Sequence, residues 1–153
     1  MSMTVVNGEK IVAALRGAFT RDATSKDLLQ LAADRIQGSG SPYTSVYMYL
    51  LKGDVLDLEA FAGRPTDHTK IAVGKGVCGT AVVENRDLNV PDVREVTNYI
   101  SCSIYTRSEL VVLIRRGPLI LGQIDVDSDR IDPFTDAEEA EIRKIADALA
   151  VLL

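Results

Sequence analysis

Two cysteines are the residues of this 153-residue chain best suited to redox chemistry. Cys78 lies in the glycine-rich stretch GKGVCGTA, and Cys102 follows 24 residues later in the polar segment NYISCS. A thiolate is a nucleophile, and a second thiol can condense with the sulfenic acid that oxidation of the first one leaves. The pair therefore indicates thiol redox chemistry, with a half-buried packing role for each cysteine as the alternative.

Three acidic residues share one expected hairpin. Asp125 and Asp127 are two positions apart on a strand, so their side chains point to the same face, and Glu109 begins the partner strand. In a suitable register the three carboxyl groups gather at one end of the sheet, where like charges raise at least one pKa. A protonated member can donate a proton and an ionised one can pair with an ammonium group. For Asp127 the alternative is a residue that ends the strand in a loop.

The glycines around Cys78 favour either a binding loop or a tight turn. Gly74, Gly76 and Gly79 allow positive φ and close approach of the backbone. Because a helix is expected to begin here, its free N–H groups are candidates to bind an anion, and we expect them to lower the pKa of Cys78. A plain strand-to-helix turn is the alternative.

Composition limits the class of protein. Hydrophobic residues make up 46% and charged residues 25% of the chain, and the net charge is −5, as in an ordinary globular domain without a basic stripe. We therefore expect one domain over residues 1–153, no nucleic acid or membrane as partner, and a cytoplasmic location. A metal site built from Cys78, Cys102 and His68 lacks a recognisable ligand spacing, so no metal is expected.

The hydrophobic pattern predicts an α+β fold. Helical spacing covers residues 9–19, 24–36, 78–86 and 133–153, while strand patterns cover 43–63, 69–73, 87–93 and 108–129, with turns at 52–54 and 115–117. Capping boxes are expected at Thr24 with Asp27 and at Thr135 with Glu138. We expect a central antiparallel sheet of five or six strands, with the N- and C-terminal helices packed on one face.

The second strand of the first hairpin carries a simple alternation. Its apolar positions are Leu56, Leu58, Ala60 and Ala62, and they alternate with Asp57, Glu59 and Phe61. This alternation predicts that one face of the strand is buried along its whole length.

The chain resembles GAF domains, and within them the free methionine-(R)-sulfoxide reductase family. The likeness rests on VGKGVCGTAVVENRDLNVPDV, YISCSIYTRSELVV, GQIDVDSD and the closing helix, and it covers most of the chain. It implies a small-molecule pocket on the sheet face opposite the terminal helices. The implied function is thiol-dependent reduction of free methionine-(R)-sulfoxide to methionine.

The resemblance also implies roles for single residues. Cys102 would be the nucleophile, Cys78 the recycling thiol, and Glu109, Asp125 and Asp127 the residues that bind the ligand and handle the proton. The further pocket residues would be Tyr49, Ser45, His68, Val77, Gly79 and Ile100. The implied ligand is free methionine sulfoxide or another metabolite, and the reductant is thioredoxin or a similar dithiol, with no bound cofactor. Dimerisation would use the terminal helices, through Leu15, Ala18 or Leu152.

Two positions depart from the family pattern. The tryptophan of the family's pocket aligns with Ser45, in a chain without tryptophan, and the usual resolving cysteine aligns with His68. These departures keep two alternatives open. One is a GAF module that binds a small molecule without catalysis, and the other is a Cys78–Cys102 redox switch, which needs Cα atoms within about 7 Å.

Overall fold

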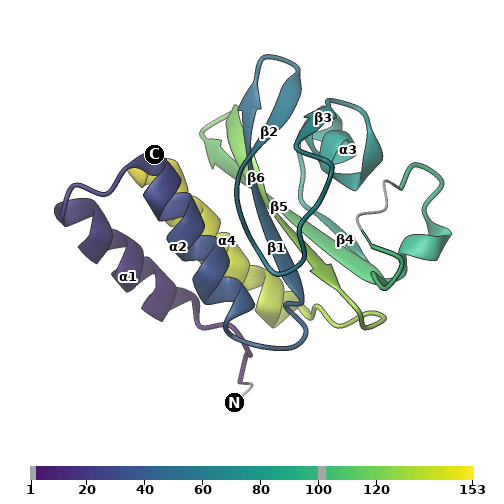
Figure 1. Ribbon diagram of the computed structural model, residues 1–153, viewed down its shortest axis with the longest axis horizontal. Helices are drawn as coiled ribbons and strands as arrows, with labels where there is room; N and C mark the ends of the chain where they lie inside the picture. Colours follow the sequence, from purple (N-terminus) through teal and green to yellow (C-terminus); the bar gives the residue numbers. More distant parts are fainter. Residues whose placement is uncertain (1–2, 100–102) are drawn as a thin grey trace.

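The sheet is six-stranded and antiparallel throughout, in a computed structural model that describes residues 3–99 and 103–153. The order is β3-β2-β1-β6-β5-β4, curled as Figure 1 shows. The strands are β1 (Ser45–Lys52), β2 (Val55–Ala62), β3 (Lys70–Ala72), β4 (Leu88–Val90), β5 (Ser108–Arg116) and β6 (Leu119–Ser128). The predicted hairpins β1–β2 and β5–β6 are confirmed, and the central pair β1–β6 joins them.

Helices cover both faces of the sheet. They are α1 (Gly8–Thr20), α2 (Ser25–Gln37), α3 (Gly76–Glu84) and α4 (Asp136–Leu152), with a 3₁₀ turn at Val93–Glu95. The helices α2 and α4 pack on one face, α1 lies outside them, and α3 lies against the other face (Figure 1). The expected α+β class is therefore confirmed, with α1 as an outer layer on α2 and α4. Within the described residues, every helix is too short or too polar to cross a membrane.

The predicted capping box is complete at α2, whereas only one of its two hydrogen bonds forms at α4. At α2 the Thr24 hydroxyl accepts from Asp27 N–H while the Asp27 carboxylate accepts from Thr24 N–H. At α4 Thr135 accepts from Glu138 N–H, but the predicted return bond is wrong. The Glu138 carboxylate instead accepts from the Tyr43 hydroxyl at 2.6 Å and from the N–H groups of residues 5 and 6. The Glu138 carboxylate therefore binds backbone N–H groups of the N-terminal segment and the buried Tyr43 hydroxyl in place of its own N-cap residue.

The single buried face predicted for β2 is also wrong. A register shift between Met48 and Tyr49 pairs Met48 with Ala60 but Tyr49 with Leu58, which leaves one extra residue on β2. Because side chains alternate with period two, one extra residue exchanges the two faces. Ala60 consequently packs in the core under the helices, while Leu58 packs on the face that carries α3.

Candidate active site

The three predicted acidic residues meet on the sheet face that carries α3. Glu109 on β5 pairs directly with Asp127 on β6, and Asp125 lies two residues further along β6. All three side chains are at most 5% exposed. The hairpin register, which the sequence left open, therefore gathers the carboxyl groups at one end of the sheet.

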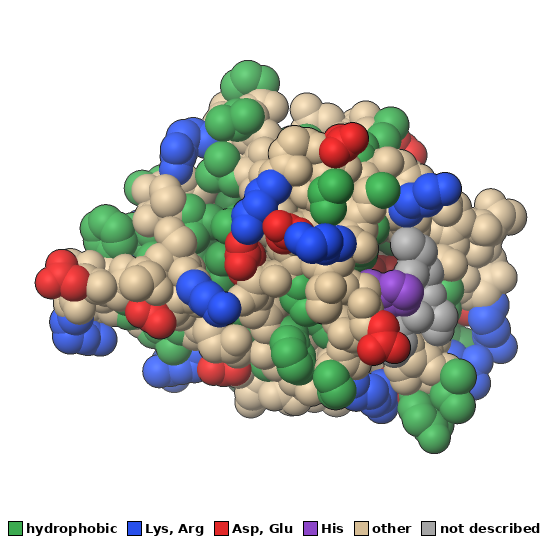
Figure 2. All heavy atoms as spheres, turned by 45° about the horizontal axis from the view of Figure 1, so that its top comes forward, with side chains coloured by type: hydrophobic (Ala, Val, Ile, Leu, Met, Phe, Trp, Pro, Cys, Tyr) green, Lys and Arg blue, Asp and Glu red, His purple; other side chains and the backbone are tan. Residues whose placement is uncertain are grey.

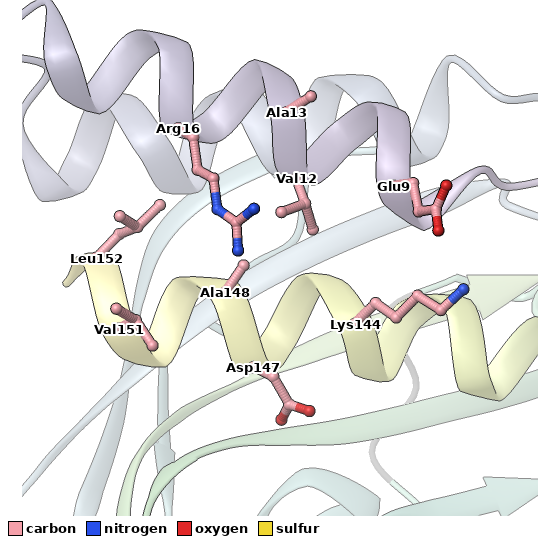
Figure 3. Close-up of a pocket in the computed structure, with 9 residues that line it drawn as sticks. All are labelled: Glu9, Val12, Ala13, Arg16, Lys144, Asp147, Ala148, Val151 and Leu152. Carbon is pink, nitrogen blue, oxygen red and sulfur yellow. The ribbon is translucent and has the colours of Figure 1, made fainter.

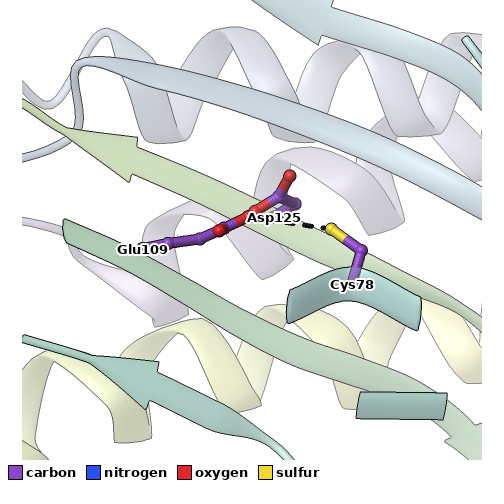
Figure 4. A group of neighbouring side chains, drawn as sticks. All are labelled: Cys78, Glu109 and Asp125. Atoms are coloured by element: carbon purple, nitrogen blue, oxygen red, sulfur yellow. Dashed lines mark hydrogen bonds between the residues drawn. The ribbon is translucent and has the colours of Figure 1, made fainter. Parts of the chain in front are cut away.

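Cys78 completes a compact cluster with two of them. It lies in the first turn of α3, and its Sγ donates to Glu109 Oε2 at 3.7 Å. Figure 4 shows the thiol pointing from α3 toward Glu109 and Asp125, and one ligand atom from each of these residues lies within 4.8 Å of the others. A small cavity adjoins the cluster, lined by these three residues and by Ile71, Lys75, Gly76 and Val77.

Burial dominates the electrostatics of this cluster. Desolvation raises the pKa of Asp127 well above its usual range, and the charge of Asp125 raises it further, while Arg64 acts in the opposite direction. Desolvation also raises the pKa of Asp125. The pKa of Cys78 is raised as well, first by desolvation and then by the neighbouring carboxylates. The lowered pKa expected for Cys78 is therefore wrong, because burial among acids outweighs the helix N-terminus.

The glycine-rich stretch shapes the start of α3. Gly74 and Gly76 have positive φ, at 92° and 64°, and a Cβ on Gly79 would lie 2.7 Å from the carbonyl oxygen of Ala72. The N–H of Gly76 donates to Asn98 Oδ1 at 3.3 Å. The Asn98 amide in turn donates to the carbonyl of Gly74 at 3.1 Å. The glycines therefore serve the turn, and Asn98 ties this turn to the segment that precedes Cys102.

Gly79→Ala is expected to lower the free energy of unfolding by about 1–3 kcal/mol, because the new methyl group must displace backbone atoms. Gly17→Ala is the matched control, since a Cβ there meets only the flexible end of Arg21 at 3.5 Å in the middle of α1. We expect that control to be neutral or more stable than the wild type. Urea denaturation measures both, and equal stability of the two variants would contradict the tight packing of α3.

Two buried tyrosines hold the loop of residues 63–69 over this face. The Tyr47 hydroxyl donates to the carbonyl of Arg64, and the Tyr49 hydroxyl donates to the carbonyl of His68, both at 2.8 Å. Ser45, which stands at the position of the family's tryptophan, is buried, and its hydroxyl accepts from Arg64 N–H at 3.0 Å. The polar ends of the predicted pocket residues Tyr49 and Ser45, together with Tyr47, which was not predicted, thus anchor the loop.

Arg64 connects that loop with two other segments. Its guanidinium forms a bidentate pair with Asp129, at 2.7 and 2.8 Å, and lies 5.2 Å from the ring of Tyr105. Asp129 follows directly after β6, and Tyr105 belongs to the segment that leads into β5. Arg64 therefore links the loop of residues 63–69 to the segment that follows β6 and to the segment that precedes β5.

The structure brings together some of the predicted site residues and not others. Cys78, Glu109, Asp125 and Asp127 are neighbours, with Val77 and Gly79 beside them on α3. The half-buried His68 reaches the surface, where Figure 2 shows the histidine side chain. Ile100 and Cys102 lie outside the described residues.

Sequence reasoning missed Arg64, Asn98 and Gln123. The Gln123 amide donates to the carbonyl of Cys78 at 3.1 Å and so holds α3 against β6. The sequence did contain a signal for Gln123, because positions 123, 125 and 127 are two residues apart on one strand and therefore lie on the same face. Arg64 and Asn98 lie in irregular segments, where sequence periodicity carries no information on contacts.

Comparison with known proteins identifies the family. The family model described as GAF domain matches residues 16–153. The chain is 36% identical to the free methionine-R-sulfoxide reductase of Escherichia coli over 105 residues, which cover 69% of this chain and 63% of that protein. The matched parts cover between 56% and 63% of the length of the first curated relatives, so the chain spans less than two thirds of them.

Solved structures agree in fold. The type II free methionine-R-sulfoxide reductase from Thermoplasma acidophilum is 37% identical, with a TM-score of 0.81 over 84% of this chain and 91% of that one. The fRMsr of Staphylococcus aureus in complex with its substrate is 27% identical, with a TM-score of 0.85 over 100% of this chain and 99% of that one. With a family model matched over most of its length, the chain belongs to the GAF domain family.

Proposed function

We propose that this protein reduces free methionine-(R)-sulfoxide to methionine by thiol chemistry. The observation that carries the proposal is the buried cluster of three carboxyl groups around Cys78, on the sheet face opposite α2 and α4. Asp125 and Asp127 each bury a carboxyl oxygen that has no hydrogen-bond partner in the described part of the chain, which suits a ligand that brings its own ammonium group. The likeness to reductases of this substrate points the same way.

The carboxyl groups have two tasks in this reaction. An ionised one pairs with the ammonium group of the amino acid, and a protonated one donates its proton to the sulfoxide oxygen. The raised pKa values of Asp125 and Asp127 favour a protonated carboxyl group near neutral pH. The cluster therefore holds both the acceptor and the donor that the reaction needs.

Cys102 is the proposed nucleophile. Its thiolate attacks the sulfoxide sulfur, the protonated oxygen moves to the cysteine, and methionine leaves, so that Cys–SH and the sulfoxide become Cys–SOH and a thioether. Tyr99, three residues earlier, packs against the cluster of buried residues that includes Cys78. The role of Cys102 rests on the resemblance to the reductases, because this residue lies outside the described residues.

Cys78 is the proposed recycling thiol. It condenses with the sulfenic acid of Cys102, which releases water and leaves a disulfide between them. A thioredoxin-like dithiol then reduces this disulfide by exchange and is itself oxidised. The raised pKa of Cys78 argues against this thiol as the first nucleophile, because the neutral thiol is a poor one.

The test is turnover of free methionine-(R)-sulfoxide by the wild-type protein, with dithiothreitol or thioredoxin as reductant. We expect methionine from the R epimer of the free amino acid and none from the S epimer. Absence of turnover with every dithiol reductant, in a protein shown to be folded, overturns the proposal.

A second candidate function is a binding module that senses a small molecule without catalysis. The observation that favours it is the buried, poorly ionised Cys78 together with His68 at the position of the usual resolving cysteine. In this case methionine sulfoxide stays unreacted, while a bound ligand raises the melting temperature. Thermal shift and turnover assays on one preparation separate the two functions.

We further propose that two copies associate through α1 and α4. A groove runs between these helices, and Figure 3 shows Val12 and Arg16 of α1 directed toward Ala148 and Leu152 of α4, with Val151 on the outer side of α4. Of the residues expected at this interface, Leu15 is fully buried inside the protein and Ala18 is partly buried against the core. Val151, which is 80% exposed, is a better candidate for the contact.

Val151→Glu is expected to shift the protein from dimer to monomer, because it places a charge in an apolar contact. Val83→Glu is the matched control, since Val83 is 64% exposed on α3, away from the groove. Light scattering after size exclusion gives the mass. A monomeric wild type, or a dimer that persists in Val151→Glu, contradicts the proposed interface.

A further inference from the structure

The cluster around Cys78 has the chemistry of a metal site. Cys78 Sγ and one carboxylate oxygen each from Glu109 and Asp125 all lie within 4.8 Å of one another, on three different elements (Figure 4). Each side chain is at most 5% exposed. Spacing in the sequence does not reveal this set, because only the β5–β6 register and the packing of α3 bring its members together.

Unpartnered carboxylate oxygens point independently to a cation. Oδ1 of Asp125 and Oδ1 of Asp127 are buried and accept no hydrogen bond. Asp127 is 3% exposed and stands directly opposite Glu109 on the same sheet face, so its carboxylate belongs to the surroundings of the cluster. Arg64, the described cation that acts on Asp127, is already paired with Asp129. Buried acceptors of this kind call for a hydrogen-bond donor or a cation, and a bound metal ion would supply the cation.

The ligand types select the ion. One thiolate with two carboxylates suits Zn²⁺, which binds sulfur at about 2.3 Å and carboxylate oxygen at about 2.0–2.2 Å. A tetrahedron of these lengths places its ligand atoms about 3.3–3.7 Å apart, so side-chain movements on the order of 1 Å close the site. A small cavity adjoins the site and is lined by the same three residues, which places it where a fourth ligand would bind.

We propose that this protein binds one Zn²⁺ through Cys78, Glu109 and Asp125, with water as the fourth ligand. Cys78 binds as thiolate, and its proton goes to solvent. The ion takes the place of the ligand's ammonium group and keeps Cys78 from forming a disulfide. We therefore expect bound Zn²⁺ to inhibit turnover of the sulfoxide. This inhibition rests on the proposed function, whereas binding of the ion does not.

Titration of the reduced, metal-free protein with ZnCl₂ against a chromophoric chelator tests the binding. We expect one equivalent to bind, and Cys78→Ser and Asp125→Asn each to weaken binding at least about 100-fold. Cys102→Ser and Asp57→Asn are the controls, the second because Asp57 lies in an exposed cluster with Lys52 and Lys70. Both controls should bind like the wild type. Circular dichroism establishes that each variant is folded.

Co²⁺ in place of Zn²⁺ reports the ligands directly. We expect sulfur-to-cobalt charge transfer in the near ultraviolet, present in Cys102→Ser and lost in Cys78→Ser. The site is overturned if the wild type binds no Zn²⁺, if Cys78→Ser and Asp125→Asn bind it unchanged, or if Cys102→Ser abolishes the charge transfer. If the protein binds Zn²⁺ but has no turnover, the metal site is supported and only the proposed function is overturned. If it has turnover but binds no Zn²⁺, the proposed function is supported and only the metal site is overturned.

Discussion

Cys102→Ser is expected to lower kcat for free methionine-(R)-sulfoxide about 10³-fold or more with dithiothreitol as reductant. The variant has no thiolate to attack the sulfoxide sulfur, and removal of a nucleophile is among the most costly changes to an enzyme. Methionine formation, followed by amino-acid analysis over time, measures the loss. Substrate binding should persist, because the carboxyl groups are intact.

Cys78→Ser is the matched control for this experiment. With dithiothreitol, which reduces a sulfenic acid directly, the variant should keep part of its turnover. With thioredoxin, which acts on a disulfide, its turnover should fall much further. Full activity of Cys102→Ser, or the reversed order of the two variants under dithiothreitol, would show that Cys78 is the nucleophile instead.

Asp127→Asn is expected to stabilise the protein while it damages catalysis. The wild type buries the Asp127 carboxyl group with Oδ1 unpartnered, and the isosteric neutral amide avoids the desolvation cost of ionising it. We expect the free energy of unfolding to rise by about 1–3 kcal/mol near pH 7, and kcat/KM to fall about 10²-fold or more if this residue acts on the ligand's proton or ammonium group. Chemical denaturation and steady-state kinetics measure the two effects.

The stability gain should depend on pH. The pKa of Asp127 is higher in the folded than in the unfolded chain, where it is about 3.9, so folding takes up a proton between these two values. The contribution of Asp127 to the free energy of unfolding of the wild type is therefore fully present below the unfolded pKa. It is lost as the pH rises through the folded pKa. The advantage of Asp127→Asn should consequently be small near about pH 4 and grow toward about pH 7.

Asp129→Asn provides the contrast at the same end of β6. Asp129 pairs with Arg64, and this ion pair lowers its pKa. Its loss should lower the free energy of unfolding slightly, by about 0–1 kcal/mol, since the pair is about 40% exposed. If Asp127→Asn were destabilised as well, the carboxylate would have a partner that offsets its burial.

Much of the fold was predictable from sequence because its signals are local. The N-cap at Thr24, the left-handed Asn85 that ends α3 and the hairpin turns each depend on a few neighbouring residues. The extra residue on β2 was not predictable, because a bulge leaves the alternation in the sequence intact and changes only the pairing. The hydrogen bonds of the Glu138 carboxylate could not be predicted either, because its donors lie more than 90 residues away in the sequence.

The candidate site also combines features that local sequence patterns predict with features that only tertiary packing decides. The common face of Asp125 and Asp127 follows from strand period alone, whereas their meeting with Glu109 and Cys78 depends on register and on the packing of α3. The pKa of Cys78 was predicted with the wrong sign because its depth of burial is a tertiary property. Arg64 and Asn98 hold loops to the site through contacts that no sequence pattern announces.

A single turnover without external reductant tests the proposed reduction most directly. Fully reduced wild-type protein is mixed with excess free methionine-(R)-sulfoxide, and the products are measured by amino-acid analysis and by mass spectrometry of alkylated peptides. The proposal predicts one methionine per chain together with a Cys78–Cys102 disulfide. In Cys78→Ser it predicts one methionine and a sulfenic acid on Cys102. Methionine sulfoxide that remains unchanged, with both thiols still free, would contradict it.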